Sequence, residues 1–215
     1  MITRVDGQET RRKILETACR VFGEKGYRDA THAEICRLAE VNTAAINYHF
    51  GSKAGLYRAT WDYVLQEVNR LIPSDGGVSP EAPAPERLRG RIRAFMQRAM
   101  DSRLGDFHRI RLKEMANPTD LLDETFAKWL RAHRKETLAI LRDLLGAKAT
   151  RKDLELCELS IIGQCHMVQK KSHSTHYKPF EKFTSRDVDC LVEHITQFSL
   201  AGIEAVHRRI KKRKG

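Results

Sequence analysis

The sequence of 215 residues lacks long apolar stretches. No segment approaches the roughly 20 consecutive apolar residues that a transmembrane helix needs, so no membrane partner is expected. Residues 1–7 contain no apolar core of the kind found in signal peptides. These absences predict a protein that stays in the compartment where it is made, the cytoplasm.

Cysteine is scarce and shows no pattern. The cysteines are odd in number, lie far apart and form no C-x-x-C pair, which argues against a disulfide framework. In a reducing cytosol such thiols are typical of small buried apolar side chains. They are Cys19, Cys36, Cys157, Cys165 and Cys190.

Motifs that mark common catalytic sites are also missing. The chain contains no glycine-rich phosphate loop, no nucleophile elbow and no H-E-x-x-H helix. We therefore expect neither an enzymatic activity nor a cofactor.

Positive charge is abundant, with 39 Lys and Arg against 28 Asp and Glu and a net charge of +11. Such a surplus favours an anionic partner without specifying nucleic acid, acidic protein or lipid. Residues 1–58 hold ten basic and seven acidic residues, whereas the run 208–214 alone holds six basic ones. That run is predicted to be a solvated tail, with a nonspecific phosphate contact as the alternative.

Apolar residues recur at spacings of three and four along nearly the whole chain, which predicts an all-α fold. Asp6 with Glu9 has the spacing of a capping box that opens a first helix, and Gly26 marks its end. Thr31 with Glu34 repeats the capping pattern. Further helices are expected at residues 43–49, 53–72, 86–101, 106–116, 121–145, 152–170 and 186–210.

Four of the six prolines fall between residues 73 and 85, which predicts a loop or linker.

Residues 31–50 have the pattern of two short helices joined by a three-residue turn. In such a unit the apolar side chains point inward and the second helix keeps its other face free for the major groove of DNA. The inward set is Ile35, Leu38, Val41 and Ile46.

The helix-turn-helix segment resembles the TetR/AcrR family of bacterial regulators. The resemblance rests on Tyr48-His49-Phe50-Gly51-Ser52-Lys53 followed by Leu56-Tyr57, preceded by Thr31, Ile35 and Val41. Residues 45–50, 114–118 and 163–165 are similar to the CecR-like branch of that family. The resemblance implies a three-helix helix-turn-helix DNA-binding domain at residues 1–55 and a helical ligand-binding and dimerisation domain at residues 56–215.

The resemblance also implies particular DNA contacts. Asn47 can pair with adenine, and Thr43 or Ala44 can touch a thymine methyl group. Contacts to the sugar-phosphate backbone, which position the protein without reading sequence, are expected from Thr31, Tyr48, His49 and Lys53. For Tyr48 the alternative is packing between helices, for His49 a helix cap, and for Lys53 an ordinary solvated lysine.

The chain departs from the family pattern at two places. Glu40 stands at the turn position where a left-handed backbone is expected and where the family usually has Gly or Asn, which predicts local strain. Ala54 replaces the usual Glu after the lysine, and Gly55 is expected to weaken the first turn of the following helix.

The remaining two thirds of the chain is predicted to bind a small-molecule effector and to form a homodimer through its last two long helices. An apolar stripe on the last helix supports either burial within the monomer or a four-helix bundle between two subunits. Candidate effector contacts, each of which can also be plain core, are Trp61, Phe95, Met96, Met115, Phe126, Trp129, Gln164, His166 and Met167.

Two other functions are also compatible with the sequence. A metal or thiol sensor can use Cys157, Cys165 and His166, together with His173 and His176. A TetR-like sensor that has lost DNA binding is the second alternative. The favoured hypothesis is a ligand-responsive transcriptional repressor that binds a palindromic double-stranded DNA operator.

Overall fold

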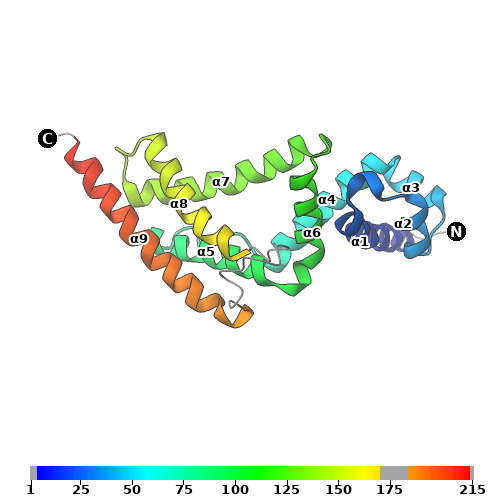
Figure 1. The fold of residues 1–215 in the computed structure, drawn as a ribbon, viewed down its shortest axis with the longest axis horizontal. Helices are drawn as coiled ribbons and strands as arrows, with labels where there is room; N and C mark the ends of the chain where they lie inside the picture. The colour runs from blue at the N-terminus through cyan, green and yellow to red at the C-terminus, as the bar shows by residue number, and fades with distance from the viewer. Residues whose placement is uncertain (1–3, 170–183, 214–215) are drawn as a thin grey trace, which may run out of the picture. The chain divides into compact units, whose positions relative to one another are not determined.

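A computed structural model describes residues 4–169 and 184–213, and in these ranges the secondary structure is helical, with connecting loops and without a strand. The all-α prediction is therefore confirmed (Figure 1). No helix in the described ranges is long and apolar enough to span a membrane. The α-helices there are α1 (Arg4–Asp29), α2 (His32–Ala39), α3 (Thr43–Phe50), α4 (Lys53–Leu71), α5 (Ala84–Met100), α6 (Gly105–Ala116), α7 (Asp123–Leu145), α8 (Arg151–Gln169) and α9 (Val188–Lys212).

The first compact unit comprises residues 1–71 and 102–129. In it α1 packs against α2, α4 and α6. Its core is built from apolar side chains that recur at helical spacing on each element, as expected for amphipathic helices around one core. Fully buried members include Ile14, Phe22, Ile35, Ile46, Leu56 and Trp61.

This unit is larger than the DNA-binding domain predicted at residues 1–55. Because α1 is long, it packs against α4 and α6 as well as against α2. Gly23 lies against α6, where a Cβ added to it would approach the Cβ of Arg109 to 3.1 Å. The domain boundary at residue 55 thus remains a prediction about function, because the compact unit that contains the helix-turn-helix also includes α4 and α6.

The start of α1 differs from the sequence prediction, whereas its interruption at Gly26 agrees with it. The helix begins at Arg4, so Asp6 lies inside the helix and the predicted Asp6–Glu9 capping box is wrong. Gly26 does interrupt the helix, with φ 80° and ψ 173°. Only glycine adopts this conformation readily, and residues 27–29 therefore form a separate turn.

The second compact unit comprises residues 72–101 and 130–215. Here α9 packs against α5 and α8, and α5 also packs against α8. The predicted stripe on the last helix faces this core, because Leu191, Val192, Ile195 and Ile203 are buried within the unit. Phe198 is the exception, with 65% of its surface exposed.

The basic residues described at the end of α9, from Arg208 to Arg213, are all exposed, as predicted for a solvated tail. Arg209 and Arg213 form ion pairs with Asp153, a carboxylate that is 4% exposed at the start of α8. Its neighbour Arg208 is exposed and pairs with Glu204. Two arginines of the exposed run thus also form ion pairs that connect the end of α9 to α8.

Candidate nucleic-acid interface

The turn between α2 and α3 has the three-residue length that the sequence predicts, residues 40–42. Thr31 caps α2, since its Oγ1 accepts a hydrogen bond of 3.2 Å from the backbone N–H of Glu34. Asn42 caps α3 in the same way, with 2.9 Å between its Oδ1 and the N of Ala45. These caps satisfy amide groups that a helix leaves without partners at its start.

Glu40 adopts the predicted left-handed conformation, with φ 53° and ψ 44°. Its side chain forms an ion pair with Lys13 of α1, at 2.8 Å between Nζ and Oε2. This pair lowers the pKa of the Glu40 carboxyl, chiefly through the hydrogen bond from Lys13. The pair connects the turn to α1 at a position where the backbone favours glycine.

Replacing Glu40 with glycine is expected to raise the thermal midpoint by about 2–4 °C, because relief of the backbone strain exceeds the small contribution of an exposed ion pair. Lys13→Gln removes only the ion pair and serves as the control, with little expected change. Thermal unfolding monitored by circular dichroism gives both values. A lower midpoint for Glu40→Gly would mean that the Lys13 contact outweighs the strain.

Helix α3 presents a polar face that no other part of the described chain covers. Of its residues only Ile46 is fully buried, and this side chain anchors the helix to the core. Thr43, Ala44 and Asn47 are all exposed. The predicted base-reading positions therefore lie on the free face of a helix short enough for the major groove.

Tyr48 is 85% exposed, so its ring does not pack between helices. His49 is half-buried between two aromatic rings, with centroid distances of 5.0 Å to Tyr48 and 5.9 Å to Phe50. Arg11 of α1 lies over the Phe50 ring at 5.4 Å. These contacts hold the end of α3 and leave the Tyr48 phenol accessible to a phosphate.

Lys53, the first residue of α4, is more constrained than the sequence suggests. Its Nζ donates a hydrogen bond of 3.0 Å to the carbonyl oxygen of Arg28 and lies 4.7 Å from the centre of the Tyr27 ring. Ser52 caps α4, accepting from the N–H of Gly55 at 3.1 Å. Lys53 is thus held against the end of α1 and is no ordinary solvated lysine.

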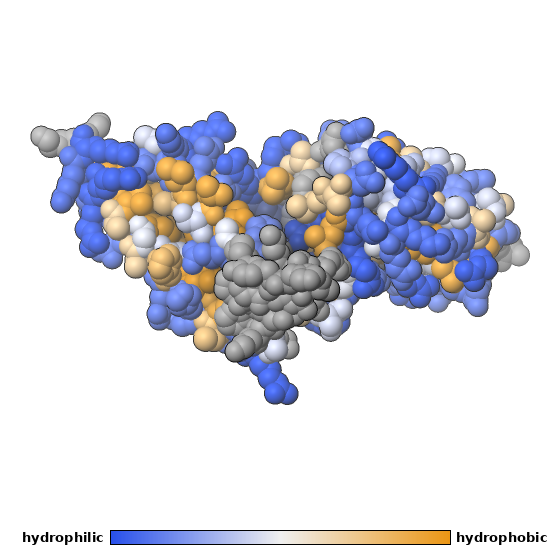
Figure 2. Space-filling model, viewed as in Figure 1, coloured by the Kyte–Doolittle hydropathy of each residue, from blue (hydrophilic) through white to orange (hydrophobic). Residues whose placement is uncertain are grey.

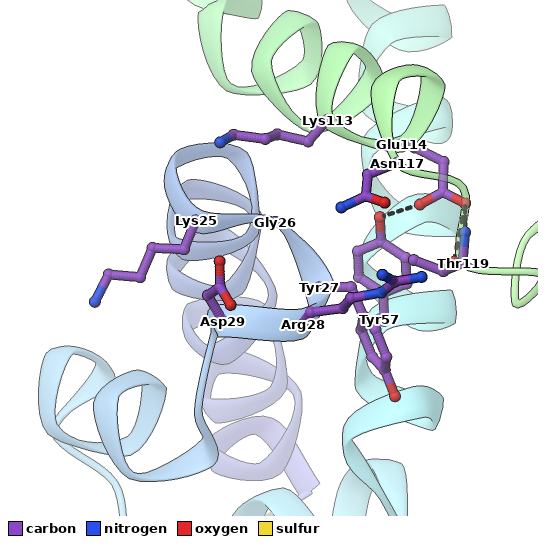
Figure 3. Close-up of a pocket in the computed structure, with 10 residues that line it drawn as sticks. All are labelled: Lys25, Gly26, Tyr27, Arg28, Asp29, Tyr57, Lys113, Glu114, Asn117 and Thr119. Atoms are coloured by element: carbon purple, nitrogen blue, oxygen red, sulfur yellow. Dashed lines mark hydrogen bonds between the residues drawn. The ribbon is translucent and has the colours of Figure 1, made fainter.

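Tyr27 is one of the residues that line a polar cavity of about 120 Å³ within the first unit (Figure 3). Tyr57 closes it on one side and donates a hydrogen bond of 2.7 Å to Glu114, whose other oxygen accepts from Thr119. Burial raises the pKa of the Tyr57 phenol. The sequence predicted none of the lining residues as ligand contacts. They come from separate segments of the chain and form no local sequence pattern. They are Lys25, Gly26, Tyr27, Arg28, Asp29, Tyr57, Lys113, Glu114, Asn117 and Thr119.

The predicted effector contacts divide between the two units. Trp61 and Met96 are fully buried core residues, whereas Met115 and His166 are exposed. Trp129 is half-buried. The side chains of Phe126 and Met167 lie outside the described residues.

Two of these contacts meet within the second unit. Phe95 and His166 form an edge-to-face contact with ring centroids 5.0 Å apart. Gln164 donates to the carbonyl of Ser160 at 3.0 Å and reaches the hydroxyl of Ser199 at 3.4 Å. A single effector pocket lined by the predicted set remains a prediction.

The cysteines largely follow the sequence expectation. Four are buried, and Cys190 is exposed. Burial raises the pKa values of the Cys19 and Cys165 thiols to about 12 and also raises that of Cys157. In the described part of the chain no three His, Cys, Asp or Glu side chains lie close enough to hold a metal ion. His173 and His176 lie outside it.

Apolar side chains also remain exposed on α8 and α9. On α8 these are Leu156 and Leu159, exposed to 49% and 67%, and on α9 the most exposed is Phe198. Gly163 and Gly202, on the same two helices, have open space where a side chain would be. Figure 2 shows apolar residues gathered over this part of the second unit. We call Leu156, Leu159 and Phe198 the α8–α9 patch.

The capped helix pair, the free face of α3 and the helical second unit define a helix-turn-helix regulator. Two family models match the chain: "Bacterial regulatory proteins, tetR family" over residues 14–60, and the C-terminal domain of the "HTH-type transcriptional dual regulator CecR" over residues 84–203. Since the second match alone spans more than half of the chain, the protein belongs to the TetR family and has a CecR-type C-terminal domain.

Two curated relatives are similar over part of the chain. The HTH-type transcriptional regulator AcrR of Shigella flexneri is 33% identical over 69 residues, 32% of each chain. The HTH-type transcriptional regulator TtgR of Pseudomonas putida is 31% identical over 101 residues, 47% of this chain and 48% of TtgR. The chain thus spans about half or less of the length of these relatives, which are transcriptional regulators.

Two solved structures share the fold over nearly the full length. A transcriptional regulator from Pseudomonas aeruginosa PAO1 has a TM-score of 0.72 at 20% identity and covers 96% of each chain. AibR, solved in complex with isovaleryl coenzyme A and operator DNA, has a TM-score of 0.60 at 18% identity and covers 88% of this chain and 97% of its own. At this identity the similarity establishes the arrangement of helices.

Proposed function

We propose that this protein is a homodimeric transcriptional repressor that binds a palindromic operator in cytoplasmic DNA and is released by a small-molecule effector. The observation that carries the DNA-binding part is the exposed face of α3, where Thr43, Ala44 and Asn47 are accessible while Ile46 is buried and anchors the helix. The proposed phosphate contacts are Thr31, Tyr48, His49 and Lys53. Such a complete set argues against a sensor that has lost DNA binding.

The α8–α9 patch supports the homodimer. An aromatic ring and two leucines exposed on adjacent helices are costly to leave in water. Glycines beside them allow another helix to approach closely. A palindromic operator has two half-sites in successive major grooves about 34 Å apart, so its reading needs two α3 helices, which a homodimer supplies.

Two observations support release from DNA by an effector: the contacts within the second unit and the similarity in fold to AibR. AibR binds both isovaleryl coenzyme A and operator DNA, so this arrangement of helices accommodates a ligand and an operator. Of the predicted contacts in the second unit, Phe95 and His166 pack against each other, and Gln164 hydrogen-bonds with Ser199. A metal or thiol sensor has less support, because burial disfavours the Cys157 and Cys165 thiolates.

Selection of bound sites from random DNA, repeated with candidate effectors, tests the proposal as a whole. The expected result is an inverted repeat whose binding weakens with one class of small molecule. A transcription assay from a promoter carrying that repeat then measures repression. Enrichment of no sequence would overturn the proposed function.

Substitutions on α3 and α4 are expected to separate base reading from phosphate contact. Asn47→Ala should lower the preference for the selected operator over a scrambled site about 10-fold, because it removes a base contact. Lys53→Ala should weaken binding to both DNAs equally and reduce the salt dependence by about one phosphate. Fluorescence anisotropy at several salt concentrations measures both effects. Equal losses on both DNAs for both variants would contradict this division.

A further inference from the structure

The way in which Lys53 is held suggests a role for a residue on another helix. A lysine at the first position of a helix faces the positive end of that helix's dipole, which is unfavourable. At Lys53 this cost is offset by the end of α1, where the Arg28 carbonyl accepts at 3.0 Å and the Tyr27 ring lies 4.7 Å away. The ammonium is thus held at one place at the start of α4.

Gly26 makes this arrangement possible. Its backbone, with φ 80° and ψ 173°, turns the chain out of the α1 helix just before Tyr27 and Arg28. As a result the Tyr27 ring and the Arg28 carbonyl both face Lys53. Tyr27 is itself supported by Tyr57, with ring centroids 4.9 Å apart, and Tyr57 is fixed by its hydrogen bond to Glu114 (Figure 3).

We propose that Tyr27 is a positioning residue for DNA binding, which fixes the Lys53 ammonium in advance of its contact with a backbone phosphate. An ammonium has three N–H donors, and the Arg28 carbonyl uses one of them. The tyrosine face attracts the positive charge as a whole and does not require an N–H donor, so donors remain for a phosphate. A long lysine side chain that is already ordered loses less conformational freedom on binding DNA. This inference rests on the proposed function.

A double-mutant cycle on operator affinity tests the inference. Tyr27→Leu is expected to weaken binding about threefold to fivefold, while Tyr27→Phe, which keeps the ring, stays close to the wild type. In a Lys53→Met background Tyr27→Leu should have no further effect, because its target is gone. The same loss in both backgrounds, or an equal loss for Tyr27→Phe, would show a packing role and overturn the inference.

A measurement without DNA separates this inference from the proposed function. After reductive methylation of lysines with ¹³C, the Lys53 signal, assigned by its absence in Lys53→Met, should be shifted by the Tyr27 ring. Tyr27→Leu should abolish the shift and Tyr27→Phe should preserve it. An unshifted signal in a wild-type protein that binds its operator overturns the positioning role alone. A wild-type protein that selects no DNA overturns both proposals, even if the shift is present.

Discussion

Replacing Phe198 with aspartate is expected to convert the protein from a dimer to a monomer without unfolding it. The ring is 65% exposed in the single chain, so a charge there costs little until a second subunit covers it. Burial of an aromatic ring contributes about 1.5–3 kcal/mol per subunit, and a buried unpaired carboxylate adds a penalty. We expect the dimer dissociation constant to rise on the order of 100-fold or more.

Operator binding should fall with the dimer, because a monomer contacts only one half-site. Analytical ultracentrifugation measures the association, and anisotropy on full and half operators measures the consequence. Leu159→Asp on α8 should act in the same way. Leu112→Asp on α6 is the matched control, since Leu112 is 49% exposed but lies outside the α8–α9 patch. A dimeric Phe198→Asp protein would place the subunit interface elsewhere.

The second large effect is expected from Gly55→Ala at the start of α4. An added Cβ there would overlap the carbonyl oxygen of Phe50, the last residue of α3. Since this atom belongs to the backbone, relief requires the end of α3 to move. We expect a loss of about 2–3 kcal/mol of unfolding free energy, as for other overpacked sites, and weaker operator binding because α3 carries the DNA contacts.

Gly7→Ala provides the control for Gly55→Ala. Gly7 lies in α1 with open space around it, so alanine there should stabilise the helix by up to about 1 kcal/mol. Chemical denaturation gives both values. Unchanged stability in Gly55→Ala would mean that α3 and α4 do not approach this closely in solution.

Local sequence patterns predicted part of the candidate nucleic-acid interface. Thr31, Asn42 and Ser52 act locally, through hydrogen bonds to amides three residues away, and the spacing of Thr31 and Glu34 predicted the first of these caps. Glu40 was recognisable for the same reason, because a turn of fixed length fixes its backbone conformation. Gly55 was interpreted only as a weak helix former, because the Phe50 carbonyl that excludes a side chain depends on how α3 meets α4.

The sequence by itself determined the helices, the helix-turn-helix and the residues of its exposed face, since periodicity and capping depend on near neighbours along the chain. Only the tertiary structure decided the partners of Lys53, the association of α6 with α1, and which side chains of α9 are buried. Its apolar stripe is buried within one chain while Phe198 stays exposed. These outcomes depend on contacts between residues far apart in sequence, which local patterns do not encode.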